Sequence, residues 1–287
     1  AELTPVAAFA EYLAEVERLP PEGRTPPCEL GSAKTEYRMS DRDLKVVSDV
    51  ISAFPQLIPA LDLSNNDITS EGISYLMAAL RGTSVRTLKL GGNPIGDDGV
   101  IVLSTALEEA AAAVACDISA LSLTGSGLTA RGFNGLMAAV TSVPSLLKLD
   151  VERNAIGAEG AAVVAAALPS APHLRHLSLA RCGLGADGFA TLADGLDRCP
   201  SKLGLRSLNL RGNGSDLRTT SLLLFSVATA CSSGLLPLTH LDLSENPLGD
   251  QGASAAADLL RQTPALQALY LDRSGLGDEG VAAVADA

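Results

Sequence analysis

The sequence contains no tryptophan, and aromatic residues make up only 3% of its 287 positions. A core anchored on a few large side chains is therefore excluded. Hydrophobic residues nevertheless account for 47% of the chain, with leucine and alanine abundant. Such a composition predicts many similar layers of small and medium aliphatic side chains, as in a stacked repeat array.

Basic residues are also scarce, since 21 Lys and Arg face 33 Asp and Glu and give a formal net charge of −12. This balance opposes the basic surface that nucleic acids and anionic lipids select, so we expect no nucleic-acid partner and no membrane partner. No apolar stretch reaches the roughly 18 residues of a membrane-spanning helix, and residues 1–19 lack the pattern of a signal peptide. We therefore expect a cytoplasmic protein.

The cysteines form no CxxC pair and are odd in number. They are Cys28, Cys116, Cys182, Cys199 and Cys231. This arrangement predicts neither a disulfide framework nor a zinc site. We interpret all five as reduced thiols in a reducing compartment.

One short pattern, LxLxxN, recurs through the chain and defines its organisation. Its leading residues are Leu61, Leu88, Leu121, Leu149, Leu177, Leu208, Leu241 and Leu269. Successive leading leucines are 27, 33, 28, 28, 31, 33 and 28 residues apart, so the underlying period is 28 residues. A period of this length is typical of a solenoid.

Each repeat unit has the signature of a strand, a turn and a helix. The LxL segment predicts a short strand, and in seven of the eight repeats an aliphatic residue and then a glycine follow at fixed offsets. Apolar residues four and eight positions past that glycine, such as Leu76 and Leu80, give one helical face. Since helices are about 10 Å wide and strands about 4.8 Å apart, the stack should curve into a right-handed α/β solenoid, a horseshoe or arc, with a parallel sheet on its concave face and helices on its convex face.

From Leu57 to the end, the pattern LxxLxLxxN/CxLxxxGxxxLxxxL at 28 residues resembles the ribonuclease-inhibitor class of leucine-rich repeats. That class includes ribonuclease inhibitor, the Ran GTPase-activating protein, the sensor arms of NOD-like receptors, and many cytoskeletal and ciliary proteins. The resemblance implies that the side chain at the sixth motif position bonds backbone groups inside the turn. We name this the ladder position, and its predicted occupants include Asn66, Asn93, Asn154, Cys182, Asn213 and Asn246.

The chain divides into three predicted parts. Residues 1–27 combine an amphipathic helix, with Val6, Phe9, Leu13 and Val16 on one stripe, and a proline-rich linker. Residues 28–57 form an N-terminal cap or degenerate repeat, and residues 58–287 form about eight repeats, the last incomplete. Because the last helix stops before its apolar face is complete, we expect the protein to continue, or another surface to cover this end.

The repeat that starts at Leu208 departs from the pattern. Ser215 stands where an aliphatic residue is expected, and Thr219 stands where glycine is expected. Moving two residues along recovers Leu217 and Phe225. This shift predicts a local insertion with a bulged turn at residues 214–216.

Three features suggest chemistry, and each has a simpler structural interpretation. The glycines of residues 183–188 match a dinucleotide fingerprint, but other repeats lack the first glycine, so they belong to the repeat turn. His173 and His176 are three residues apart on a strand and point to opposite faces, and His240 lies two strands further along. Cys182 is expected to be a buried structural residue. We therefore predict no enzyme activity, no cofactor and no metal.

Residues beside the strand leucines should face the concave side. In the later repeats this register places charged and polar residues there: Lys148, Asp150, Glu152, Arg153, His176, Arg181, Asn209, Arg211, His240, Asp242 and Glu245. The earlier strands offer small residues instead: Ala60, Thr87, Gly91, Gly92, Ala120, Ser122 and Gly125. The charged patch is either a protein-binding surface or merely solvated charge, and the sequence leaves both open.

The function favoured by these observations is a non-enzymatic scaffold or assembly subunit that binds partner proteins. The family resemblance favours a cytoskeletal or ciliary assembly and membership of a larger complex. The alternative is a GTPase-activating protein resembling the Ran activator, although that family's catalytic asparagine maps to no clear position and its acidic tail is absent. A sensing arm of a receptor is a weaker alternative. A ribonuclease inhibitor is weaker still, since that inhibitor is rich in cysteine and contains tryptophan, unlike this chain.

Overall fold

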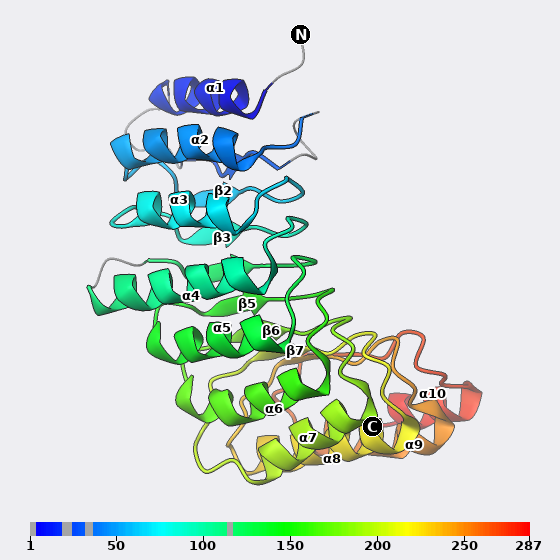
Figure 1. The fold of residues 1–287 in the computed structure, drawn as a ribbon. Helices are drawn as coiled ribbons and strands as arrows, with labels where there is room; N and C mark the ends of the chain where they lie inside the picture. The colour runs from blue at the N-terminus through cyan, green and yellow to red at the C-terminus, as the bar shows by residue number, and fades with distance from the viewer. Residues whose placement is uncertain (1–3, 19–24, 32–36, 114–116) are drawn as a thin grey trace. The chain divides into compact units, whose positions relative to one another are not determined.

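The computed structural model describes residues 4–18, 25–31, 37–113 and 117–287 (Figure 1). Cys116 and residues 20–24 of the proposed linker lie outside these ranges. The chain divides into two compact units, Ala1–Leu149 and Asp150–Ala287.

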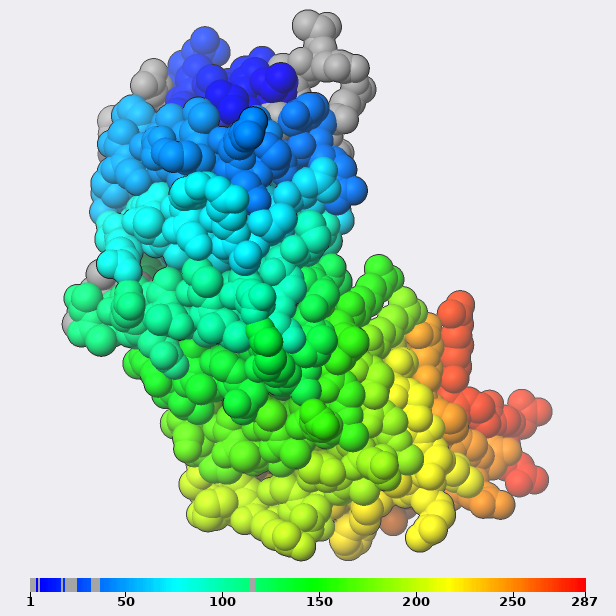
Figure 2. Space-filling model, viewed as in Figure 1, coloured from blue at the N-terminus to red at the C-terminus, as the bar shows by residue number. Residues whose placement is uncertain are grey.

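The first unit alternates helices with short strands in chain order. Its elements are α1 (Pro5–Glu17), β1 (Cys28–Glu29), α2 (Asp41–Ala53), β2 (Ala60–Asp62), α3 (Ser70–Leu80), β3 (Thr87–Lys89), α4 (Gly96–Ala112), β4 (Ala120–Ser122) and α5 (Ala130–Ser142). The strands are parallel, and Leu61 pairs with Leu88, which pairs with Leu121. At the surface, α2, α3 and α4 form successive bands (Figure 2). Strand β5 (Lys148–Asp150) spans the boundary between the units.

The second unit repeats the same order. Its elements are α6 (Gly157–Ala167), the 3₁₀ turn η1 (Leu168–Ser170), β6 (His176–Ser178), α7 (Gly185–Asp197), β7 (Ser207–Asn209), α8 (Leu217–Ser232), β8 (His240–Asp242), α9 (Gly249–Gln262), β9 (Ala268–Tyr270) and α10 (Asp278–Ala285). Parallel pairing again aligns the leading leucines, Leu177 with Leu208, Leu241 and Leu269. The predicted repeat of strand, turn and helix is therefore confirmed, with its register.

The core of each unit is built from aliphatic layers, as the composition predicts. The central leucine of β2, β3, β6 and β8 is almost fully buried, and the apolar stripe of each helix packs over the same layer. Phe133 and Phe189 are the largest fully buried side chains among the described residues. Repetition of one layer thus replaces the aromatic anchors that the sequence lacks.

Acidic residues near the helix starts stabilise neighbouring repeats. Asp41, the first residue of α2, accepts hydrogen bonds from the Thr69 backbone N at 2.9 Å and from its hydroxyl at 2.6 Å. Asp97 in α4 binds Thr129 in the same way, at 2.8 Å and 2.6 Å. A carboxylate at this place caps the next helix and also offsets the positive ends of the helix dipoles.

The N-terminal helix α1 buries a face that differs in part from the predicted stripe. Phe9 and Val16 are buried as expected, but Val6 is exposed. Tyr12 takes its place in the buried face, and its hydroxyl lies 3.0 Å from the Pro26 carbonyl oxygen and 3.4 Å from that of Leu57. A phenol with a bonded hydroxyl supplies both apolar area and a polar link to the cap.

In the cap, α2 packs with Leu44, Val47 and Ile51 buried, whereas Val46 is exposed. The helix begins with a capping box in which Ser40 and Asp43 bond each other's backbone groups. This box fixes the start of the helix and hence which face it buries.

The predicted insertion in the repeat from Leu208 was also wrong. Asp216 caps α8 with φ −109° and ψ 171°, close to the φ −108° and ψ −171° of Thr69, which caps α3 at the same place in its repeat. The two positions that we took for the shifted pattern do not pack: Phe225 is 63% exposed, and Leu217 is only half-buried.

Two hydroxyl groups explain why this turn keeps its ordinary geometry. Ser215 is buried at the aliphatic position and lies 2.6 Å, oxygen to oxygen, from the hydroxyl of Thr220. The paired hydroxyls satisfy each other where other repeats pack two apolar side chains. The extra residues lie instead at the end of α8, which runs to Ser232 and closes at Gly234 with φ +73°.

The long spacing after Leu88 is likewise absorbed by a helix. Alanine prolongs a helix at little cost, and α4 runs for 17 residues to Ala112. Val114 and Ala115 lie outside the described residues.

Candidate functional site

The residue before the ladder position has left-handed backbone geometry in every repeat. We name it the turn position. Its φ values are Asn65 58°, Gly92 72°, Gly125 59°, Arg153 58°, Arg181 53°, Gly212 63°, Glu245 60° and Arg273 54°. A residue other than glycine costs about 1 kcal/mol or more in this conformation. In the second unit four of the five turn positions nevertheless carry Arg or Glu, and strain retained in this way often accompanies function.

The ladder residues lie beneath these turns and hold them in shape. Asn66, Asn93, Asn154, Asn213 and Asn246 are all at most 4% exposed. In the first unit Asn66 Nδ2 donates to the carbonyl oxygens of Leu30 at 3.0 Å and Leu63 at 2.9 Å, and its Oδ1 accepts from Met39 N at 2.8 Å. The amides of Asn66, Asn93, Asn213 and Asn246 thus satisfy backbone groups of their own turn and of the preceding repeat, and Asn154 Nδ2 donates to the Val151 carbonyl oxygen of its own turn at 2.7 Å.

Cys182 occupies the ladder position of its repeat. Its thiol is buried and lies 3.3 Å from the Val151 carbonyl oxygen, to which it donates. Burial raises the pKa of the Cys182 thiol to about 12, so the reactive thiolate does not form near neutral pH. Among the other cysteines, Cys28, Cys199 and Cys231 are free thiols, and Cys116 lies outside the described residues.

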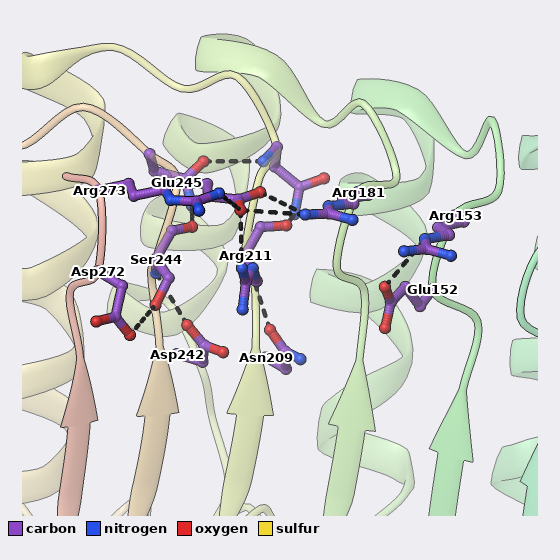
Figure 3. Close-up of polar contacts among 12 residues, drawn as sticks. Glu152, Arg153, Arg181, Asn209, Arg211, Asp242, Ser244, Glu245, Asp272 and Arg273 are labelled. Carbon is purple, nitrogen blue, oxygen red and sulfur yellow. Dashed lines mark hydrogen bonds and ion pairs between the residues drawn. The ribbon is translucent and has the colours of Figure 1, made fainter.

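Four charged side chains of the second unit meet at the turns, and we call them the Glu245 cluster: Arg181, Arg211, Glu245 and Arg273 (Figure 3). Arg181 Nη2 lies 2.8 Å and 3.1 Å from the two carboxylate oxygens of Glu245. Arg211 Nη2 lies 2.7 Å from Glu245 Oε1, and Arg273 Nη1 lies 3.3 Å from the same oxygen. One carboxylate therefore holds guanidinium groups from three different repeats.

Gly212 makes this pairing possible. It stands at the turn position of the repeat between those of Arg181 and Glu245, and a methyl group there would lie only 3.1 Å from Arg181 Cγ and 3.2 Å from Glu245 Oε2. Without a side chain in the middle, two residues that are two strands apart can reach each other. A residue larger than glycine would push the pair aside.

The electrostatics of the cluster follow from this geometry. Hydrogen bonds from Arg211 and Arg181 lower the pKa of Glu245 to about 2, and Glu245 in turn raises the pKa of Arg211. The carboxylate therefore stays ionised across the physiological range. The cluster carries three positive charges and one negative charge.

This shift predicts a pH-dependent stability. Because the pKa of Glu245 is lower in the folded chain than its ordinary value of 4.5, the carboxylate stabilises the fold above that value. The contribution is lost as the pH falls from about 4.5 toward 2. We expect Glu245→Gln to have a lower urea midpoint than wild type at pH 7. The difference between the two midpoints should shrink as the pH falls toward 2. A difference that stays constant over this range would contradict the assignment.

The polar residues beside the strands lie nearer the sheet than the arginines do (Figure 3). Asn209 accepts a hydrogen bond from Arg211 N at 3.0 Å, Asp242 accepts from Ser244 N at 2.9 Å, and Asp150 accepts from Glu152 N at 3.0 Å. These three predicted site residues therefore also shape the turns. The pairing register places His176 in line with His240, with Ser207 on the strand between them.

The structure brings together only part of the predicted patch. Arg181, Arg211 and Glu245 meet directly, while Arg153 pairs with its neighbour Glu152 at 3.4 Å. Lys148 belongs to the first unit.

The predicted patch omitted strand-side residues in the earliest and last repeats. Tyr270, which is 48% exposed, and Arg273 belong to the last repeat, where the same register would have found them. In the first unit the expectation of small residues alone was wrong, because Lys89 and Asp62 also stand beside the strand leucines, with Lys89 Nζ 3.1 Å from Asp62 Oδ2. Both residues stand between the motif leucines, so the repeat pattern was sufficient to identify them.

Within the ranges that the structure describes, no group of three or more His, Cys, Asp or Glu residues is placed to hold a metal ion. No helix in those ranges is long and apolar enough to cross a membrane.

A family model described as "Leucine Rich repeat" matches residues 59–77, 83–104, 144–165, 170–193 and 236–255. Together with the repeats seen in both units, these matches show that the chain is a leucine-rich-repeat protein with an α/β solenoid fold, of the repeat type found in NOD-like receptors.

Two known proteins illustrate the similarity. The human protein "NACHT, LRR and PYD domains-containing protein 5" is 30% identical over 180 residues, which are 62% of this chain and 12% of that protein. The chain therefore spans only a small part of the length of that relative. A solved structure of "Leiomodin-1 Actin-Binding Site 2 (ABS2)" is 20% identical with a TM-score of 0.38, covering 47% of this chain and 75% of that one.

Proposed function

We propose that this protein is a non-enzymatic scaffold that binds partner proteins through the strand side of its second unit, the side opposite the helices. The Glu245 cluster carries this proposal. It fixes Arg181 and Arg211 in place through a shared carboxylate, and the exposed Tyr270 lies on the neighbouring strand β9. Arg and Tyr are the residues that most often dominate protein interfaces.

The preorganised arginines favour a binding surface over a solvated one. Long charged side chains on a solvated face keep their rotamer freedom, which an interface must then remove at a cost of about 0.5–1.5 kcal/mol per side chain. Here the ion pairs and the left-handed turns at Arg181 and Glu245 already restrict that freedom. A partner would therefore meet a surface with much of this cost removed.

The wider setting that we propose is a cytoskeletal or ciliary assembly, because the resembled class includes such proteins. GTPase activation is the alternative that the resemblance leaves, and multiple-turnover GTP hydrolysis with a panel of small GTPases separates it from a scaffold. Acceleration of hydrolysis would replace the non-enzymatic role.

Affinity capture with three variants tests the strand side directly. Tyr270→Ala and Arg211→Gln should each lose the proteins that wild type captures, because each removes an anchor from the centre of the proposed interface. Phe225→Ala alters an equally prominent exposed side chain on helix α8 and should retain them. Capture is quantified by mass spectrometry of cross-linked complexes.

The comparison decides between the two sides of the solenoid. If Phe225→Ala loses the partners while the strand-side variants keep them, the proposed binding surface is wrong. Neutral variants are preferable to charge reversal, since Glu at positions 181 and 211 would place three carboxylates together and disturb the turns.

A further inference from the structure

The Glu245 cluster has more positive charge than its own carboxylate offsets. Asp242 and Asp272 also lie near Arg211, but both interact with Ser244: Asp242 Oδ1 accepts from its backbone N at 2.9 Å, and Asp272 Oδ2 lies 3.4 Å from its hydroxyl. These two acids lie on the strand side of the cluster (Figure 3). The guanidinium groups at the turns therefore form a positively charged surface, and the two aspartates form a more acidic surface next to it on the strand side.

The exposures show which groups of the cluster a partner can reach. The Glu245 side chain is only 18% exposed, whereas Arg181 is 37%, Arg211 is 38% and Arg273 is 80% exposed. The carboxylate is thus less exposed than the guanidinium groups that it orients. The remaining donors of those groups face outward.

Arg211 has an additional feature that a purely structural ion pair does not explain. Its Nε is buried and has no hydrogen-bond partner among the described residues. Leaving a charged group's donor unsatisfied carries a free-energy cost, and such exceptions in native structures call for a specific reason. Holding Arg211 where its outer donors are presented to a ligand supplies that reason.

We propose that the Glu245 cluster binds an oxyanion-bearing side chain of the partner polypeptide, a phosphoserine or a carboxylate. This inference rests on the proposed function and gives the chemistry of its partner. Guanidinium groups bind carboxylate and phosphate through two parallel hydrogen bonds, and clustered arginines are the usual receptors for phosphorylated side chains. Phosphate, with three acceptor oxygens and nearly two charges, suits three donors from different repeats best.

The geometry gives Arg211 and Glu245 opposite roles toward such a ligand. Arg211 contributes a donor, so its loss should weaken binding. Glu245 orients the same guanidinium groups but also competes for them with its negative charge. Glutamine keeps a side-chain oxygen that accepts from the arginines and removes the charge, so Glu245→Gln should strengthen binding. A merely structural cluster would respond to both changes in the same direction.

Fluorescence anisotropy with degenerate nine-residue peptides provides the test. The central residue is fixed as phosphoserine, glutamate or glutamine, and the flanks are randomised. We expect wild type to bind the phosphoserine set most tightly and the glutamine set most weakly. Arg211→Gln should weaken binding of the phosphoserine set at least tenfold, and Glu245→Gln should tighten it severalfold.

Arg153→Gln is the matched control. Arg153 stands at the left-handed turn position, as Arg181 does, with φ 58°, and its side chain is exposed, but it pairs with Glu152 outside the cluster. Binding should be unchanged in this variant. Equal binding of the three peptide sets, equal losses in Arg153→Gln and Arg211→Gln, or weaker binding in Glu245→Gln would each overturn the proposal. Binding to vesicles of anionic lipid in place of peptides would overturn it as well.

Partner capture and peptide binding together distinguish failure of the oxyanion site from failure of the proposed interface. If Tyr270→Ala abolishes partner capture but the peptide sets bind equally, the scaffold stands and the oxyanion site fails. If the phosphoserine set binds but all strand-side variants capture the same proteins, the oxyanion site stands and the proposed interface fails.

Discussion

Replacing Asn213 by alanine should lower the free energy of unfolding by about 3–4 kcal/mol, since each buried group left unpaired costs about 1–3 kcal/mol. Asn213 Nδ2 donates to the carbonyl oxygens of Leu179 and Leu210, both at 2.9 Å. Its Oδ1 accepts from Cys182 N at 2.9 Å and from Leu184 N at 3.3 Å. Alanine leaves three of these buried backbone groups, all in the preceding repeat, without this partner, whereas the Leu210 carbonyl oxygen keeps its bond from Asn246 Nδ2 at 2.8 Å.

Urea unfolding measures the total loss, and hydrogen exchange locates it. The amides of Cys182 and Leu184 should exchange faster in the variant, because Asn213 no longer accepts their hydrogen bonds. Asn134→Ala is the control, since Asn134 is exposed on helix α5, where alanine is the better helix former. Equal stability of the two variants would show that the ladder amides contribute little to the repeat.

The ladder illustrates what the sequence predicts well. An asparagine that recurs with the strand leucines must lie inside the stack, and a buried amide needs partners wherever it lies. Burial, register and the alternation of strand and helix all follow from one repeated pattern. Each repeat confirms the others, so a departure in a single repeat does not change the fold.

Departures within a repeat are harder to predict because they depend on pairing between side chains. Ser215 in an aliphatic position suggests an insertion, but the hydroxyl of Thr220 satisfies it and the turn keeps its length. In the same way, Tyr12 is buried in α1 in place of Val6 because two carbonyl oxygens lie within reach of its hydroxyl. Sequence periodicity identifies apolar positions but does not show which polar groups can satisfy each other there.

The Glu245 cluster shows the same limit at the candidate site. The register identifies Arg181, Arg211 and Glu245 as neighbours in a patch, but their pairing depends on the missing side chain at Gly212 and on left-handed backbone at two turn positions. A pattern that reports only which side of a strand a residue faces contains neither fact. The side-chain network therefore required the structure.

Gly204 is a position where the fold tolerates no side chain, and Gly204→Ala should destabilise the protein by about 3 kcal/mol, the upper end for overpacking a core. Gly204 is buried before strand β7. A methyl group on its Cα would overlap the carbonyl oxygen of Pro172, a backbone atom that cannot rotate away. Arg175 fixes this close approach, because its Nη1 donates to the carbonyl oxygens of Gly204 at 2.8 Å and Pro172 at 3.1 Å.

The same substitution at Gly135 should have the opposite sign. Gly135 lies within helix α5, and its nearest neighbour to an added methyl group is Ile101 Cγ1 at 3.8 Å, an ordinary contact distance. Alanine there gains about 0.5–1 kcal/mol by restricting the unfolded chain. Urea midpoints of the two variants should therefore lie on either side of wild type. If Gly204→Ala matched wild type, the backbone at Pro172 would have to yield, and the loops before β6 and β7 would be less closely packed than their hydrogen bonds to Arg175 indicate.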